Sequence, residues 1–119
     1  MATVLIIDDD PDFSYALSRT VRKMGHSALM AGAMAEGERL AETEDVDAVF
    51  LDVRLPELDG LACFERMRAL DPAARIAFVT GMRDEAAGRV AHEGAALAVF
   101  DKPVQIEQLL SLLEDAPRG

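Results

Sequence analysis

Apolar stretches rich in β-branched residues recur along the chain, and each is separated from the next by a segment long enough for a helix. Such alternation is typical of a parallel β-sheet with helices on both faces. The pattern therefore predicts an α/β fold with a doubly wound, five-stranded parallel sheet. Its strands are expected at residues 3–7, 28–31, 47–51, 75–79 and 96–100.

The segments between these strands carry helix signals. In the first, Pro11 suits the first helical turn, Gly25 is placed to end the helix, and apolar residues recur at helical spacing. This apolar face comprises Phe13, Ala16, Leu17, Val21 and Met24. The second helix, around 33–44, has few large apolar residues and contains Gly37, so we expect it to be the loosest of the set. Further helices are predicted over about 61–70, 83–93 and 105–114.

Size and charge limit the class of protein. The chain has 119 residues and is 50% apolar, which suits a single domain over 1–119, with the repeated pattern filling about 3–114 and a short tail at 115–119. Its net charge of −10 should repel a phosphate backbone, so direct nucleic-acid binding is not expected. The apolar runs are far shorter than the roughly 20 residues of a membrane span, and no basic segment precedes the first of them. We expect a cytoplasmic protein without a membrane segment.

Consecutive aspartates, Asp8 to Asp10, follow the first predicted strand although like charges repel. With the flavodoxin-like (βα)5 strand order 2-1-3-4-5, strands one and three flank a crevice at the carboxyl edge of the sheet. Asp8 and Asp9 would then face Asp52, which ends the third strand. Asp10, beside Pro11, is most simply explained as a helix N-cap.

Two more polar residues share this edge, because Thr80 ends the fourth strand and Lys102 follows the fifth. Clustered carboxylates are tolerated when a hard divalent cation neutralises them, and few protein ligands with waters left over suit Mg²⁺. A cation also makes Asp52 approachable by an anion, so that its carboxylate can attack phosphorus. The oxygens of the resulting acyl phosphate need a hydroxyl donor and a compact cation, which Thr80 and Lys102 supply.

Four segments, in this order, resemble the receiver domain of bacterial two-component response regulators: LIIDDDPDF, VFLDVRLPELDG, FVTG and DKP. The resemblance covers about residues 3–114. It implies that Asp52 accepts a phosphoryl group from the histidine of a sensor kinase or phosphotransfer protein. It also implies that Asp9 and Asp52 contact magnesium directly, with the backbone carbonyl of Arg54 as a third ligand and Asp8 acting mostly through water.

The resemblance further implies a switch. Thr80 and Lys102 would hold the phosphoryl oxygens and shift on phosphorylation. A downstream protein or output domain, or a second copy of the chain, would then meet the surface formed by the fourth helix, fifth strand and fifth helix. Such a domain is a signalling phosphoacceptor that catalyses its own phosphorylation and dephosphorylation and is not otherwise an enzyme.

One position departs from the family pattern. Receiver domains usually carry an aromatic residue three positions before the lysine, and here that residue is Val99, while the side chain of Phe100 points to the opposite face of a strand. We hypothesise that phosphorylation still biases the loop after Thr80 and that the rearrangement of the fifth strand is muted. The same departure is the feature that favours an alternative function, a receiver-like interaction module that binds a partner without phosphorylation.

Arg54 follows the predicted phosphoacceptor by two residues. It either influences water attack on the acyl phosphate or is a solvated arginine that supplies only its carbonyl, and both interpretations stay open.

Three other kinds of protein are disfavoured by particular residues. A haloacid-dehalogenase-type phosphatase requires aspartate where Arg54 stands. An EF-hand loop starting at Asp8 fails because Phe13 and Arg19 replace its glycine and glutamate. A flavodoxin-like flavin binder is disfavoured because aspartates after the first strand would repel the cofactor phosphate.

Overall fold

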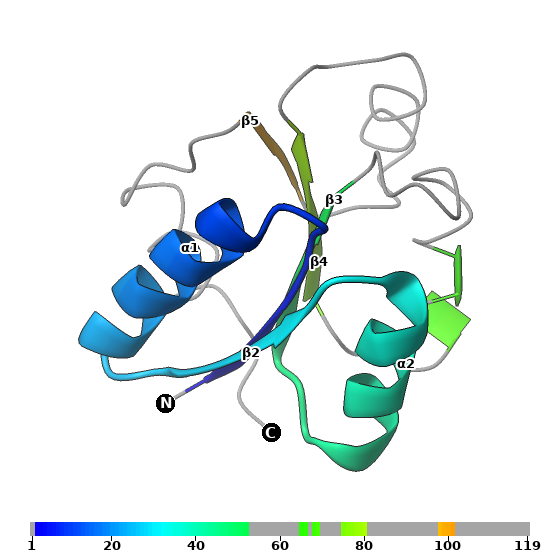
Figure 1. The fold of residues 1–119 in the computed structure, drawn as a ribbon. Helices are drawn as coiled ribbons and strands as arrows, with labels where there is room; N and C mark the ends of the chain where they lie inside the picture. Colours follow the sequence, from blue (N-terminus) through cyan, green and yellow to red (C-terminus); the bar gives the residue numbers. More distant parts are fainter. Residues whose placement is uncertain (1, 53–64, 67, 70–74, 81–97, 102–119) are drawn as a thin grey trace.

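The computed structural model describes residues 2–52, 65–66, 68–69, 75–80 and 98–101. Within this part of the chain, five parallel strands form one sheet in the order β2-β1-β3-β4-β5, which confirms the predicted doubly wound arrangement. Two helices of the described part lie on opposite faces of the sheet (Figure 1). The elements are β1 (Thr3–Ile7), α1 (Pro11–Lys23), β2 (Ser27–Ala31), α2 (Met34–Thr43), β3 (Ala48–Asp52), β4 (Arg75–Thr80) and β5 (Ala98–Asp101).

The strand boundaries agree closely with the predicted ones, and the clearest difference has a physical cause. Asp47 was expected to open the third strand, but β3 begins at Ala48. The carboxylate of Asp47 accepts a hydrogen bond from the Thr3 amide at 2.8 Å, and the Asp47 amide donates to the Thr3 carbonyl at 2.9 Å. These bonds hold Asp47 at the amino edge of the sheet, just ahead of β3.

The two described helices confirm the first two helix predictions, and residues 65–66 and 68–69 are helical, as expected for 61–70. The predicted helices at 83–93 and 105–114 lie outside the described residues. In the part of the chain that the structure covers, no helix is both long and apolar enough to cross a bilayer.

Helix α1 ends where glycine allows the chain to turn. Gly25 has a φ of 90°, in the left-handed region that glycine adopts without a steric penalty. Its amide donates to the Arg22 carbonyl at 3.0 Å, and the His26 amide donates to the Val21 carbonyl at 3.2 Å. This pair of bonds is the Schellman closure of a helix, so Gly25 ends α1 as predicted.

The buried face of α1 differs from the predicted one. Leu17 and Val21 pack into the core as expected, but Ala16 is exposed and two serines, Ser14 and Ser18, are buried. These four buried residues lie on one stripe at helical spacing, and the stripe joins the alternate side chains of β1 and β3 that face α1. The prediction that Ala16 belongs to the buried face was wrong. An apolar pattern does not count small polar residues such as Ser14 and Ser18, which let a helix lie close to a sheet.

Helix α2 covers the other face and approaches β1 closely. Gly37 is buried, and a Cβ at this position would lie 2.5 Å from Cδ1 and 2.9 Å from Cγ1 of Ile7. Gly37 therefore allows α2 to lie against the last residue of β1, which is a packing role. That α2 is the loosest helix stays a prediction.

Candidate functional site

The loop after β1 places Asp8 and Asp9 at the carboxyl edge of the sheet. Only 3% of Asp8 is exposed, whereas Asp9 is an exposed residue. The Asp8 amide donates to the Ala31 carbonyl at 3.0 Å, and Asp8 Oδ1 accepts a hydrogen bond from the Asp10 amide at 2.8 Å. Because taking a carboxylate out of water is costly, such amide bonds help to hold Asp8 at the strand end. Asp8 is thus fixed within the loop, and Asp9 faces solvent.

Asp10 has a different role from its two neighbours. Its Oδ1 accepts hydrogen bonds from the amides of Asp12 at 3.1 Å and Phe13 at 3.3 Å, and Pro11 follows at the first position of α1. These amides have no partner within the helix, and their partial positive charge favours an adjacent carboxylate. The structure confirms that Asp10 is the N-cap of α1.

The register between β1 and β3 brings their carboxyl ends to one level. Ile7 pairs with Leu51, so Asp8 and Asp52 are each the next residue along neighbouring strands. Neighbouring strands of a sheet lie about 4.8 Å apart. The backbone of Asp52 is therefore adjacent to the loop that carries Asp8 and Asp9.

The same edge continues into β4 and β5. Asp52 pairs with Val79, and Thr80 is the last residue of β4. Thr80 pairs in turn with Asp101, the last residue of β5, and Lys102 comes next in the sequence. By backbone position, Asp52 and Thr80 share one edge of the sheet with the acidic loop.

The remaining expected positions are placed only in part. Arg54 and Lys102 lie outside the described residues, so the proposed contacts of the Arg54 carbonyl and the Lys102 ammonium stay predictions. Val99, where the family pattern has an aromatic residue, lies within β5 and pairs with Phe78 of β4. The unusual residue is therefore in the strand that adjoins the one ending in Thr80.

The donor atoms at this edge suit a hard divalent cation. Asp8 and Asp9 supply carboxylate oxygens from one loop, and such oxygens, completed by waters, are the ligands of Mg²⁺ and Ca²⁺ in proteins. Among the side chains that the structure describes, no group of three or more His, Cys, Asp and Glu is arranged to hold a metal. A further protein ligand would come from the adjacent end of β3, where Asp52 lies by register.

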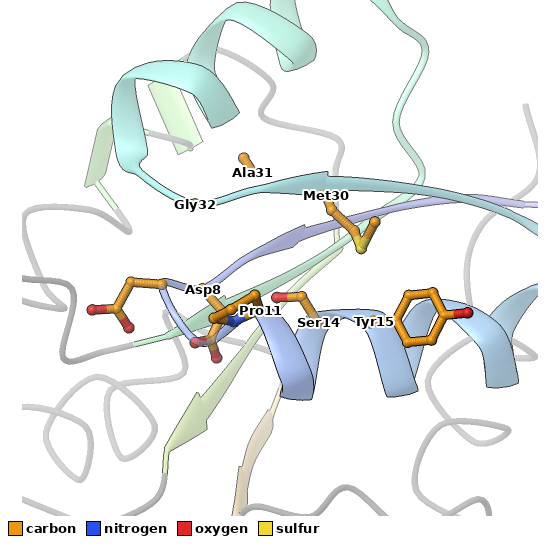
Figure 2. A pocket seen from close by; sticks show the side chains of 8 residues that line it. Asp8, Pro11, Ser14, Tyr15, Met30, Ala31 and Gly32 are labelled. Atoms are coloured by element: carbon orange, nitrogen blue, oxygen red, sulfur yellow. The ribbon is translucent and has the colours of Figure 1, made fainter.

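A pocket that was not predicted from the sequence opens beside the acidic loop, between α1 and the end of β2 (Figure 2). Its volume is about 440 Å³, and one of its lining residues is the buried Ser14. A serine adds nothing to an apolar pattern. The available signal was its position one helical turn before Leu17, on the buried stripe of α1. The lining residues are Asp8, Asp9, Pro11, Ser14, Tyr15, Met30, Ala31 and Gly32.

A model of the response regulator receiver domain matches residues 4–114, a range that spans the candidate site from Asp8 to Lys102. The chain belongs to the response regulator receiver domain family. Receiver domains of response regulators are signalling domains rather than classical enzymes, and they bind a divalent metal ion. Family membership thus agrees with the fold and with the oxygen-rich edge described above.

Two curated relatives are longer than this chain. The chain is 29% identical over 115 residues to the transcriptional regulatory protein GlrR of Escherichia coli (strain K12). The aligned region covers 97% of this chain and 26% of GlrR. The chain is 32% identical over 112 residues to a response regulator receiver protein of Anaeromyxobacter sp. (strain Fw109-5). This aligned region covers 94% of this chain and 47% of that protein. The chain therefore spans about a quarter to a half of the length of these curated relatives.

Solved receiver structures share the architecture. A CheY-like receiver domain from Methanospirillum hungatei JF-1 superposes with a TM-score of 0.87 at 24% identity, covering 97% of this chain and 92% of that one, which supports the fold. A response regulator from Burkholderia pseudomallei has a TM-score of 0.85 at 28% identity, covering 97% and 68%. The Burkholderia structure contains a phosphorylated aspartic acid, a calcium ion and citrate.

Proposed function

We propose that this receiver domain accepts a phosphoryl group on Asp52 from the phosphohistidine of a sensor kinase or phosphotransfer protein. The pairing of Ile7 with Leu51 is the main support, because it leaves Asp8 and Asp52 as the next residues on neighbouring strands. In the proposed step, a carboxylate oxygen of Asp52 forms a bond to phosphorus. The bond from phosphorus to the histidine nitrogen breaks, and its electron pair returns to the imidazole ring. The product is an acyl phosphate on Asp52.

The residues around Asp52 would divide the remaining work. Asp9, Asp52 and the Arg54 carbonyl would hold Mg²⁺ directly, and Asp8 would act mostly through water. The bound ion would supply charge neutralisation for the carboxylates and for the phosphoryl oxygens. The burial of Asp8 and the exposure of Asp9 support this division between a held carboxylate and an accessible one.

Two further residues would bind the transferred group. The hydroxyl of Thr80 would donate a hydrogen bond to one phosphoryl oxygen, and the ammonium of Lys102 would pair with another. The register of Thr80 with Asp101 supports this role, because it brings the end of β4 beside the residue that precedes Lys102.

In this proposal, residues 1–119 form one receiver domain, which works in the cytoplasm. Its partner surface consists of the predicted fourth helix, the fifth strand and the predicted fifth helix. This surface would meet a downstream protein, an output domain or a second copy of the chain. The relative GlrR is a transcriptional regulatory protein and is longer than this chain, which supports an output of this kind.

Incubation with acetyl phosphate and MgCl₂, followed by intact-protein mass spectrometry, tests the proposal. The wild type should gain one phosphoryl group, and Asp52→Asn or chelation of the metal should abolish the gain. Asp45→Asn is the matched control, because Asp45 is an exposed aspartate in the loop before β3. A wild type that gains no mass would contradict the proposal and favour the interaction module that binds its partner without phosphorylation.

The Val99 departure gives a second test, of the switch itself. We expect an acyl-phosphate mimic to shift the backbone amide resonances of the loop after Thr80 more than those of β5, because a valine replaces the usual aromatic residue. Heteronuclear NMR with and without the mimic measures both regions. Large shifts centred on Val99 and Phe100 would refute a muted strand.

A further inference from the structure

Two buried serines on α1 differ in one respect. Ser14 and Ser18 lie one turn apart on the sheet-facing side of the helix, and both are buried. The Ser18 hydroxyl donates to the Tyr15 carbonyl at 2.8 Å. Within the described part of the chain, the Ser14 hydroxyl has no hydrogen-bond partner, although only 4% of the residue is exposed. Buried polar groups are nearly always paired, so this hydroxyl needs an explanation.

The Ser14 side chain faces the pocket between α1 and β2. Figure 2 shows Ser14 on the helix and Met30 on the strand, with their side chains extending into the space between the two elements. Among the described residues, the large hydrophobic side chains that are exposed are Tyr15, at 56%, and Met30, at 39%, and both line this pocket. Apolar walls around one hydrogen-bonding group are typical of small-molecule sites.

The walls favour an aromatic occupant. The Met30 thioether and the Tyr15 ring both make favourable contacts with a flat ring. The guanidinium carbon of Arg19 lies 5.8 Å from the centroid of the Tyr15 ring, a cation–π contact that restrains the ring at the pocket. The volume, about 440 Å³, is within the usual range for small-ligand pockets.

The acidic residues at the pocket favour a positively charged ligand. Asp8 and Asp9 line one end, and the whole chain carries a net charge of −10, so an anion would be repelled and a cation attracted. We propose that this pocket binds a small aromatic amine, with its ring between Tyr15 and Met30, its polar ring atom at the Ser14 hydroxyl and its ammonium toward Asp9. The site lies beside the proposed phosphoacceptor and does not depend on phosphorylation.

Tryptamine is a suitable probe because the chain contains no tryptophan, so the indole fluorescence comes from the probe alone. Its fluorescence anisotropy is measured as the protein is titrated in, with EDTA present and no phosphodonor, which keeps the test separate from metal binding. Tryptophol, with the same ring and no charge, and indole-3-acetate, an anion, are the matched ligands. We expect tryptamine to bind, tryptophol to bind more weakly and indole-3-acetate not to bind.

Protein variants locate the site. Ser14→Ala should weaken tryptamine binding by about 2- to 10-fold, the usual effect of losing one hydrogen bond, and Ser18→Ala, which removes a paired hydroxyl one turn away, should leave it unchanged. Met30→Lys, which puts a positive charge at the pocket, should abolish binding. Thermal unfolding shows whether each variant is folded, and Ser14→Ala should be at least as stable as the wild type because it removes a buried unpaired hydroxyl.

The amide resonances of the wild type complete the test. Tryptamine should shift the amides of Ser14, Tyr15, Met30 and Gly32. Equal binding of all three indoles, shifts outside these residues, or full binding by folded Ser14→Ala and Met30→Lys would each overturn the proposal. Full binding by these two variants would show that tryptamine only forms a surface ion pair at the acidic loop.

Discussion

The two ends of β1 use polar side chains differently. At the amino end, His26 Nδ1 accepts a hydrogen bond from the Ala2 amide at 2.9 Å, and Asp47 Oδ2 accepts one from the Thr3 amide at 2.8 Å. Both side chains come from residues far along the chain, so they join β1 to the turn before β2 and to the segment before β3. Polar groups at this edge stabilise the fold.

At the carboxyl end, the loop carries more aspartates than are needed to accept its main-chain amides. Asp8 accepts the Asp10 amide, and Asp10 caps α1, but Asp9 is exposed on the same loop. The register places Asp52 next along the sheet. An aspartate thus stabilises this fold where it accepts main-chain amides, whereas Asp9 is left exposed at the edge to which the register also brings the backbone of Asp52.

The largest expected effect separates function from stability at the carboxyl end. Asp9→Asn should slow magnesium-dependent phosphorylation by at least about tenfold, because even indirect metal partners usually contribute that much. The free energy of unfolding should stay within about 0.5 kcal/mol of the wild type, since Asp9 is exposed. Phosphoryl incorporation by mass spectrometry and urea denaturation measure the two quantities. A destabilised but fully active Asp9→Asn variant would show that Asp9 serves the fold and not the phosphorylation reaction.

The amino end should show the opposite behaviour. Asp47→Ala removes the acceptor of the Thr3 amide and should lower the free energy of unfolding by about 1–3 kcal/mol, while phosphorylation of the folded protein continues. Urea denaturation measures the change, with Asp45→Ala as the exposed control. Equal stability of the two variants would show that the Asp47 carboxylate contributes nothing to the fold.

The smallest effect distinguishes neighbours within the acidic run. Asp10→Ala removes the cap of α1 and should lower the free energy of unfolding by about 1 kcal/mol, whereas Asp10→Asn should retain most of the stability because asparagine caps equally well. Thermal unfolding compares the two. If Asp10→Asn lost as much stability as Asp10→Ala, charge rather than capping would be the cause.

The strands, both ends of α1 and the position of the acidic loop could be predicted from the sequence because each depends on a local signal, whereas the sheet order came from the flavodoxin-like fold class that the alternation of strands and helices indicates. Apolar runs mark the strands, Asp10 with Pro11 marks the helix start, and Gly25 marks its end. The family motifs suggested the roles of the strand-end residues, and these roles stay predictions. The register shows that the backbones of Asp52 and Thr80 share one edge of the sheet.

Other features depend on contacts between distant segments and leave no local signal. Asp47 meets Thr3 only after β1 and β3 pair, and Gly37 shows its packing role only once α2 lies against Ile7. The burial of Ser14 instead of Ala16 follows from how α1 is rotated on the sheet, which a small polar residue cannot indicate in the sequence.

A titration with MgCl₂, followed by the backbone amide resonances of the wild type, Asp9→Asn and Asp52→Asn, tests the central claim most directly. We predict saturable shifts in the wild type at Asp8, Asp9 and the residues following Leu51, and at least about tenfold weaker binding in both variants. Shifts centred on another part of the chain, or equal affinity in all three proteins, would contradict a metal site shared by the ends of β1 and β3.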